Sequence, residues 1–245
     1  MEKNTYYHDG KFLNEEQMIN RVKSYYDKPA PRTIKALQMV EGNKILDLGC
    51  GTGDVTYAIA KKTPPNGKVI GIDFLEDSIR MAKKMFVSPN LEFRHGNLEE
   101  LKFQPASFDC IVLFEVIEHV DNPMLLAKKI HKLLKPGGYF VVSTPNGSSL
   151  DAFFQNFKSP HDSIKQINSE KGESGTQTDH LYTWSLPLLY RLLHRSGFHY
   201  VKHEFAGVGF PFTNIDSKLG TNLSNLFSPL FGRFGMGIIL KVRKV

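Results

Sequence analysis

The amino-acid sequence predicts an α/β fold built on a doubly wound, mostly parallel sheet. Three observations predict this class. Between residues 45 and 145, short apolar runs alternate with amphipathic ones, and strands that alternate with helices form parallel sheets covered on both faces. A glycine-rich turn at residues 49–53 follows the first apolar run and opens an amphipathic segment. The length of 245 residues, with 41% hydrophobic content, suits one domain of this kind.

The elements are expected to follow one another in a regular order. Strands of the core are expected at Lys44–Leu48, Lys68–Phe74, Leu91–His95, Phe108–Glu115 and Tyr139–Thr144. Helices of the core are expected at Asp54–Lys62, Glu76–Phe86 and Pro123–Leu134, and the last shows apolar residues at helical spacing. Pro136-Gly137-Gly138 predicts a helix stop and a turn. Outside the core we expect helices at Glu15–Tyr26, Arg32–Val40 and Leu186–His194, and strands at Tyr200–Phe205 and Gly237–Val242.

These elements predict a single domain, residues 1–245, with four parts. The parts are a helical cover at 1–42, a ligand-binding core at 43–147, an insertion at 148–184, and a C-terminal helix and strands at 185–245. Gln155–Asp179 is polar and long for a connection inside a compact domain, which predicts a mobile lid or a surface insertion. Phe205–Phe234 holds six phenylalanines. Irregular packing over the sheet, an apolar ligand pocket and a surface that contacts lipid are the alternatives there.

Charge and cysteine usage restrict the partners and the compartment. The 31 basic and 25 acidic residues give a net charge of +6, which mildly favours anionic partners. The lysines are scattered over expected polar helix faces, which favours a solvated surface over a nucleic-acid footprint. Cys50 and Cys110 lie in apolar runs and predict buried thiols in a reducing compartment. The polar start and the lack of a long apolar run predict a cytoplasmic protein.

The glycine-rich turn predicts a nucleotide site. Glycines let the backbone approach a ligand closely, and the helix that follows offers free N–H groups. The dinucleotide fingerprint requires glycine where this chain has Asp54, and the Gly-Lys-Ser/Thr of a P-loop is absent. Asp73 ends the second strand, where a carboxylate can accept both hydroxyls of a ribose. Its alternative role is a helix N-cap.

Taken together, the segments resemble the motifs of class I S-adenosylmethionine-dependent methyltransferases. The matching segments are Ile45–Gly53, Gly71–Phe74, Gly96–Leu98, Phe108–His119 and Leu134–Asn146. The resemblance implies a Rossmann-like, seven-stranded sheet whose last strand is antiparallel. It also implies S-adenosylmethionine as methyl donor and S-adenosylhomocysteine as product.

The resemblance implies a role for each matched residue. Asp47 and Gly49 would lie by the methionine part, Asp73 on the ribose, and Asn97 with Leu98 on the adenine. The family more often has Asp where this chain has Asn97, whose amide oxygen can still accept from the adenine amino group. The full set of expected cofactor-binding residues is Asp47, Gly49, Cys50, Gly51, Asp73, Phe74, Asn97, Leu98 and Glu115.

The resemblance also implies that the segment after the fourth strand, Glu115–Val120, faces the transferred methyl. Together with residues 143–146 and 179–184, it resembles ubiquinone-pathway O-methyltransferases and small-RNA 3′-terminal 2′-O-methyltransferases, and the second group uses such residues to hold a metal. Glu115, Glu118 and His119 share one face if the segment turns helically. The expected catalytic residues are His119, His180 and Glu115, and the expected divalent-cation ligands are Glu115, Glu118, His119 and His180.

The expected activity is O-methylation of a hydroxyl on a small or lipid-linked molecule such as a phenol, sugar or natural product. Peripheral membrane contact would accompany a lipid-linked acceptor. RNA ribose 2′-O-methylation is an alternative, but the chain lacks a dense basic stripe. N- or C-methylation of a small molecule and a non-catalytic cofactor-binding protein are further alternatives.

Overall fold

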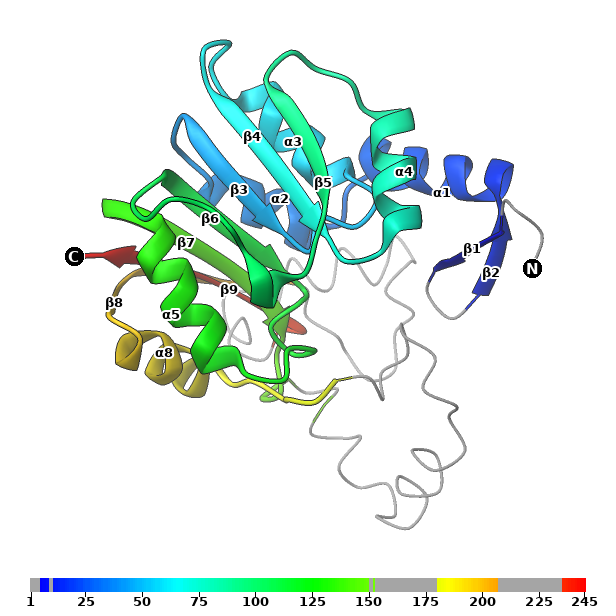
Figure 1. Ribbon diagram of the computed structural model, residues 1–245. Coiled ribbons are helices and arrows are strands. Elements are labelled where there is room, and N and C mark those ends of the chain that lie inside the picture. Colours follow the sequence, from blue (N-terminus) through cyan, green and yellow to red (C-terminus); the bar gives the residue numbers. More distant parts are fainter. Residues whose placement is uncertain (1–4, 9–10, 150–151, 153–179, 207–234) are drawn as a thin grey trace.

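A seven-stranded sheet forms the centre of the computed structural model, which describes residues 5–8, 11–149, 152, 180–206 and 235–245. The strand order is β5-β4-β3-β6-β7-β9-β8 (Figure 1). Its strands are β3 (Lys44–Leu48), β4 (Lys68–Asp73), β5 (Leu91–His95), β6 (Phe108–Phe114), β7 (Leu134–Pro145), β8 (Phe198–Ala206) and β9 (Gly237–Lys244). Strands β3 to β7 pair in parallel, and β9 is antiparallel to both of its neighbours. The predicted fold class is confirmed.

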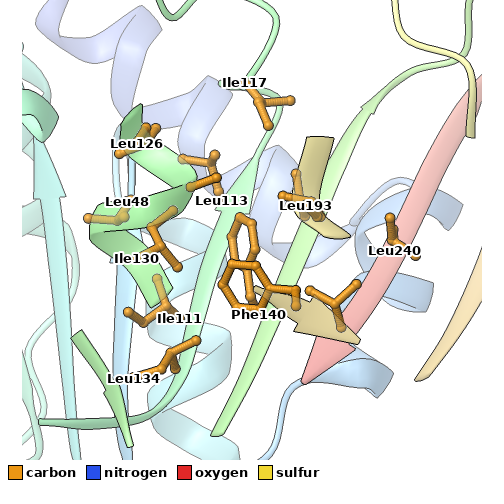
Figure 2. Close-up of a cluster of buried hydrophobic side chains, with 14 of the residues drawn as sticks. Leu48, Ile111, Leu113, Ile117, Leu126, Ile130, Leu134, Phe140, Leu193 and Leu240 are labelled. Carbon is orange, nitrogen blue, oxygen red and sulfur yellow. The ribbon is translucent and has the colours of Figure 1, made fainter. Parts of the chain in front are cut away.

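Helices cover both faces of this sheet. They are α1 (Glu15–Asp27), α2 (Pro31–Met39), α3 (Asp54–Lys62), α4 (Glu76–Met85), α5 (Pro123–Leu133) and α8 (Leu186–Arg195), with a short 3₁₀ helix at Leu98–Glu100. The α5 and α8 helices lie on one face, while α2 and α3 lie on the other (Figure 1). Side chains alternate across each strand, so Leu46 and Leu48 face α5 while Ile45 faces α2 and α3. Figure 2 shows the α5 side of this core around Phe140.

Most of the expected elements lie within one or two residues of their predicted bounds, as is usual at element ends. The helix stop predicted at Pro136–Gly138 is confirmed, since α5 ends at Leu133, but β7 runs through the residues of the predicted turn. Leu134 pairs with Phe108, and the register then shifts before Cys110. Such an irregularity accommodates a proline, which has no N–H to donate to the ladder.

A two-stranded antiparallel sheet, β1 (Thr5–His8) and β2 (Lys11–Asn14), was not expected from the sequence. The dipeptide Asp9-Gly10 between these strands is a strong hairpin signal that could have revealed it.

Cys50 and Cys110 are both buried free thiols, as predicted. The predicted lid at 155–179 lies outside the described residues, as does most of the phenylalanine-rich segment. Among the described helices, none is both long and apolar enough to cross a bilayer.

Candidate functional site

The glycine-rich loop lies at the carboxyl edge of the sheet, directly after β3. The backbone N–H groups of Gly49 and Cys50 both donate to the carbonyl of Ile72, at 2.8 and 2.9 Å, which ties the loop to β4. Gly49 has a φ of 73°, and a Cβ there would lie 2.4 Å from Cγ2 of Val116. Only glycine therefore fits between β3 and the segment that follows β6.

Asp73, at the end of β4, holds the loop in place from the other side. Its Oδ2 accepts from the N–H of Gly51 at 2.8 Å, and its Oδ1 accepts from the N–H of Leu75 at 2.9 Å. Burial raises the pKa of Asp73, and these two N–H donors oppose the rise. The N-cap of α4 is Leu75, so the alternative N-cap role of Asp73 is not the one observed.

The side chains of Asp47 and Cys50 are buried beneath the backbone of the loop, whereas Gly51 lies on its open side. Asp47 is buried, and its Oδ2 accepts from the Thr56 hydroxyl at 2.7 Å. Cys50 is buried as well. A Cβ at Gly51 would meet no other atom within 4 Å. The open face of the loop is therefore at Gly51, next to the Asp73 carboxylate.

Two further residues of the expected cofactor set are exposed at neighbouring strand ends. Asp73 is in register with His95, so β4 and β5 end together. Phe74, just past β4, is 61% exposed, and Asn97, just past β5, is also exposed. Leu98 is half-buried against the core. An exposed aromatic side chain and an exposed amide therefore follow β4 and β5, the two strands on this side of the loop.

Glu115 follows β6 and has an unusual backbone conformation, with a φ of 56°. Its Oε1 accepts from the Ser143 hydroxyl at 2.6 Å, and its Oε2 forms a salt bridge with Nη1 of Arg32 at 2.8 Å. Arg32 belongs to α2 and was not among the predicted site residues. A partner so distant in the chain leaves no local signal in the sequence.

Glu118, His119 and His180 come together beside Glu115. One potential ligand atom from each of the three lies within 4.8 Å of the others, and the two imidazole rings contact edge to face with centroids 4.8 Å apart. Glu115 does not belong to this group of three, since Arg32 and Ser143 hold its carboxylate. The structure thus brings together three of the four predicted cation ligands.

Glu118 connects this group to the rest of the edge. Its Oε2 accepts from the Thr144 hydroxyl at 3.0 Å, and its backbone carbonyl accepts from the N–H groups of Leu181 and Tyr182. The carbonyl contacts attach the segment that carries His180 to the end of β6. Burial raises the pKa of Glu118 to about 7, and the charge of Glu115 adds to this rise.

Together, the doubly wound sheet with an antiparallel final strand, the glycine loop and the strand-tip carboxylate define a class I S-adenosylmethionine-dependent methyltransferase. A family model described as "Methyltransferase domain" matches residues 40–190. The chain belongs to this methyltransferase family and is an enzyme. This assignment argues against the alternative of a non-catalytic cofactor-binding protein.

Curated relatives carry a more specific name. The chain is 33% identical over 164 residues to a demethylmenaquinone methyltransferase of Lactococcus lactis, a match that covers 60% of this chain and 65% of the relative. It is 35% identical over 125 residues to a demethylmenaquinone methyltransferase of Staphylococcus aureus, covering 51% of this chain and 52% of the relative. The matches thus span between half and two thirds of these relatives.

Solved structures share the fold at lower identity. An S-adenosylmethionine-dependent methyltransferase from Mesorhizobium loti has a TM-score of 0.64 at 20% identity, covering 89% of this chain and all of the other. A Haloferax volcanii methyltransferase solved in complex with a methyltransferase activator has a TM-score of 0.65 at 19% identity, covering 94% of each chain.

Proposed function

We propose that this methyltransferase acts on a hydroxylated aromatic acceptor of the quinol type, the reduced form of a quinone. One observation carries the proposal. Glu118, His119 and His180 form a cluster of proton-accepting groups beside Glu115, at the edge of the sheet that holds the glycine loop. The names of the two relatives, which contain a quinone acceptor, support the choice of acceptor class.

We propose that the glycine loop and the ends of β4 and β5 bind the methyl donor, S-adenosylmethionine. The donor would lie over Gly51, where no Cβ blocks the loop, with its ribose hydroxyls on Asp73 and its adenine between Phe74 and Asn97. When bound, it supplies a methyl group on a positively charged sulfur. Asp47 and Cys50 lie beneath the loop, so we propose that they support its shape while Gly49 and Gly51 line the donor.

The ribose role of Asp73 leads to a quantitative expectation. Replacing Asp73 with Asn removes the charge that a ribose diol pairs with, at a cost of about 1.5–3 kcal/mol. Calorimetry should then show at least about tenfold weaker binding of S-adenosylhomocysteine. Asp77→Asn, on the exposed surface of α4, should bind like the wild type. Equal affinity for Asp73→Asn and wild type would contradict the assignment.

The protein's part in the reaction is positioning and removal of one proton. We propose that His119, the exposed member of the cluster, accepts the proton of the acceptor hydroxyl. The resulting phenolate carries electron density on its oxygen and on a neighbouring ring carbon. When one of these atoms is held about 3 Å from the methyl, it forms a bond to carbon. The carbon–sulfur bond breaks, and its electron pair stays on the sulfur. If the attacking atom is the ring carbon, that carbon then loses its hydrogen as a proton, the former hydroxyl oxygen regains a proton, and the aromatic quinol ring is restored.

Two atoms of the acceptor can receive the methyl group. The sequence favoured a hydroxyl oxygen, whereas the name of the relatives favours a ring carbon, and we propose the carbon. The test supplies a short-chain demethylmenaquinol, kept reduced, with methyl-deuterated donor, and identifies the product by mass spectrometry and NMR. A ring-methylated product supports the proposal. An O-methyl ether would restore the prediction made from the sequence, and labelling of RNA instead would support the ribose alternative.

A cation at the same cluster is a second candidate mechanism. Glu118, His119 and His180 offer one carboxylate and two imidazoles within 4.8 Å, a set that suits Zn²⁺ or Fe²⁺. A cation there would lower the pKa of the acceptor hydroxyl without a strong base. Chelation separates the two mechanisms, because only the cation-assisted reaction requires added metal for recovery.

A further inference from the structure

We propose that the outward faces of α5 and α8, with Leu181 and Tyr182, form a surface that docks on a bilayer containing anionic lipid. We call it the α5–α8 surface. The inference rests on the proposed function only in supplying a reason for the contact, since a lipid-linked quinol resides in a membrane. The positions of its side chains and its charge support the surface independently of that function.

The two helices present the same pattern to solvent. Both lie side by side on one face of the sheet (Figure 1), and both bury leucine or isoleucine residues against it. On the opposite side of each helix, a leucine is followed by basic residues three and seven positions later, the spacing of one helix face. The outward residues are Leu125, Lys128 and Lys132 on α5 and Leu188, Arg191 and Arg195 on α8.

Apolar side chains gather at the amino-terminal ends of both helices. Leu125 is 46% exposed, Leu188 is 48% exposed and Leu181 is 58% exposed. The Tyr182 hydroxyl donates to the carbonyl of Asp121 at 3.0 Å, which places this segment beside the start of α5. Isolated exposed leucines are ordinary, but these share one end of the surface with the His119 and His180 cluster.

The charge of the surface complements anionic headgroups. Neither α5 nor α8 contains Asp or Glu, and in the described part of the chain no ion pair involves Lys128, Lys132, Arg191 or Arg195. The exposed Asp121 precedes α5 and is outnumbered by these bases. Basic residues beside exposed apolar ones are the composition of an interfacial membrane contact.

Lipid fits this surface better than single-stranded nucleic acid does. Proteins that bind single strands stack successive bases on aromatic side chains along a basic groove, whereas the outward apolar residues of α5 and α8 are aliphatic and Tyr182 is the one aromatic residue in the surface as defined. With the leucines in the bilayer and the bases at the headgroups, the edge that carries His119 would face the membrane. A lipid-linked acceptor would then reach the site without crossing water.

The experiment is co-sedimentation with vesicles of phosphatidylcholine alone or mixed with phosphatidylglycerol. We expect binding only to the mixed vesicles, weakened by salt. The variant K128A/K132A/R191A/R195A should bind at least about tenfold more weakly, and L125Q/L188Q should also bind more weakly. The matched control K61A/K62A/K83A/K84A removes the same charge from α3 and α4 and should bind like the wild type.

Several results would overturn the proposal: no binding of wild type to mixed vesicles, or equal losses in the control variant. Displacement from vesicles by single-stranded RNA, with RNA binding lost in the same four-residue variant, would assign the surface to RNA instead. Unchanged thermal unfolding and S-adenosylhomocysteine binding exclude misfolding. Turnover of a water-soluble short-chain quinol is measured in parallel, so that failure of the proposed function is seen independently of vesicle binding.

Discussion

His119→Ala is expected to lower kcat for the quinol acceptor by about 10²- to 10⁴-fold, the usual contribution of a positioned general base. The structure makes His119 the exposed member of a group whose other members, Glu118 and His180, are more buried. Removing the imidazole leaves in place the bonds that hold the donor loop, since these join its backbone N–H groups to the Ile72 carbonyl and the Asp73 carboxylate. Binding of S-adenosylhomocysteine should therefore be unchanged. Single-turnover measurements with saturating donor are the suitable test.

Comparison among variants distinguishes a shared role from separate ones. If His119 and His180 serve one proton transfer, the double variant should be about as slow as His119→Ala, because residues that act as a unit are not additive. His199→Ala, on the exposed part of β8, is the matched control and should be fully active. Full activity of His119→Ala and His180→Ala would rule out both bases. Loss of activity on chelation, with recovery on adding a divalent cation, would replace the base mechanism by the cation one.

Asp47→Asn is expected to change how stability depends on pH. Burial is the main cause that raises the pKa of Asp47 from its usual 3.8 to about 7, with opposition from the Thr56 hydroxyl and smaller additions from Asp54 and Asp73. The folded state therefore prefers the protonated carboxyl. An Asn side chain resembles that form and can accept from Thr56.

The direction follows from the two states of the chain. Well below the unfolded pKa of 3.8, Asp47 is protonated whether the chain is folded or unfolded. Between the unfolded pKa and the folded pKa of about 7, only the unfolded chain releases the proton, so the wild type loses stability as the pH rises. The advantage of Asp47→Asn should grow by about 3 kcal/mol between about pH 5 and pH 8.

Urea unfolding of the cofactor-free protein across this pH range measures the effect directly. Asp27→Asn, at the exposed end of α1, is the control and should track the wild type. A constant difference between Asp47→Asn and wild type at every pH would show that Asp47 is ionised in the folded state.

The sheet was predictable because its signals are local. Each buried strand is a short apolar run, and each helix between strands shows apolar spacing that a single sequence displays. The β1–β2 pair was missed although Asp9-Gly10 carried its signal. The path of β7 was less predictable, because Pro136 and Gly137 indicate a turn unless pairing of Leu134 with Phe108 continues the strand.

In the candidate site, too, some features could be predicted from local sequence, and others depend on how distant segments pack. Glycine spacing and the strand-tip position of Asp73 placed the donor loop, since both depend on residues next to each other in the chain. Whether Asp47 would face a ligand or the core depended on the packing of Thr56 from α3. The engagement of Glu115 by Arg32 and Ser143 likewise depended on elements far apart in sequence.

The sequence by itself determined the order of strands and helices, the methyltransferase class and the region of the donor site. Hydrophobic periodicity records the order of the elements and glycine placement records the loop, while the methyltransferase class came from the resemblance of the motifs to that family. Only the tertiary structure decided that Glu118, His119 and His180 form one group without Glu115. It also decided that α5 and α8, which expose Leu125 and Leu188, contact each other on one face of the sheet. Such groupings arise when segments far apart in the sequence pack together, and local sequence patterns therefore cannot predict them.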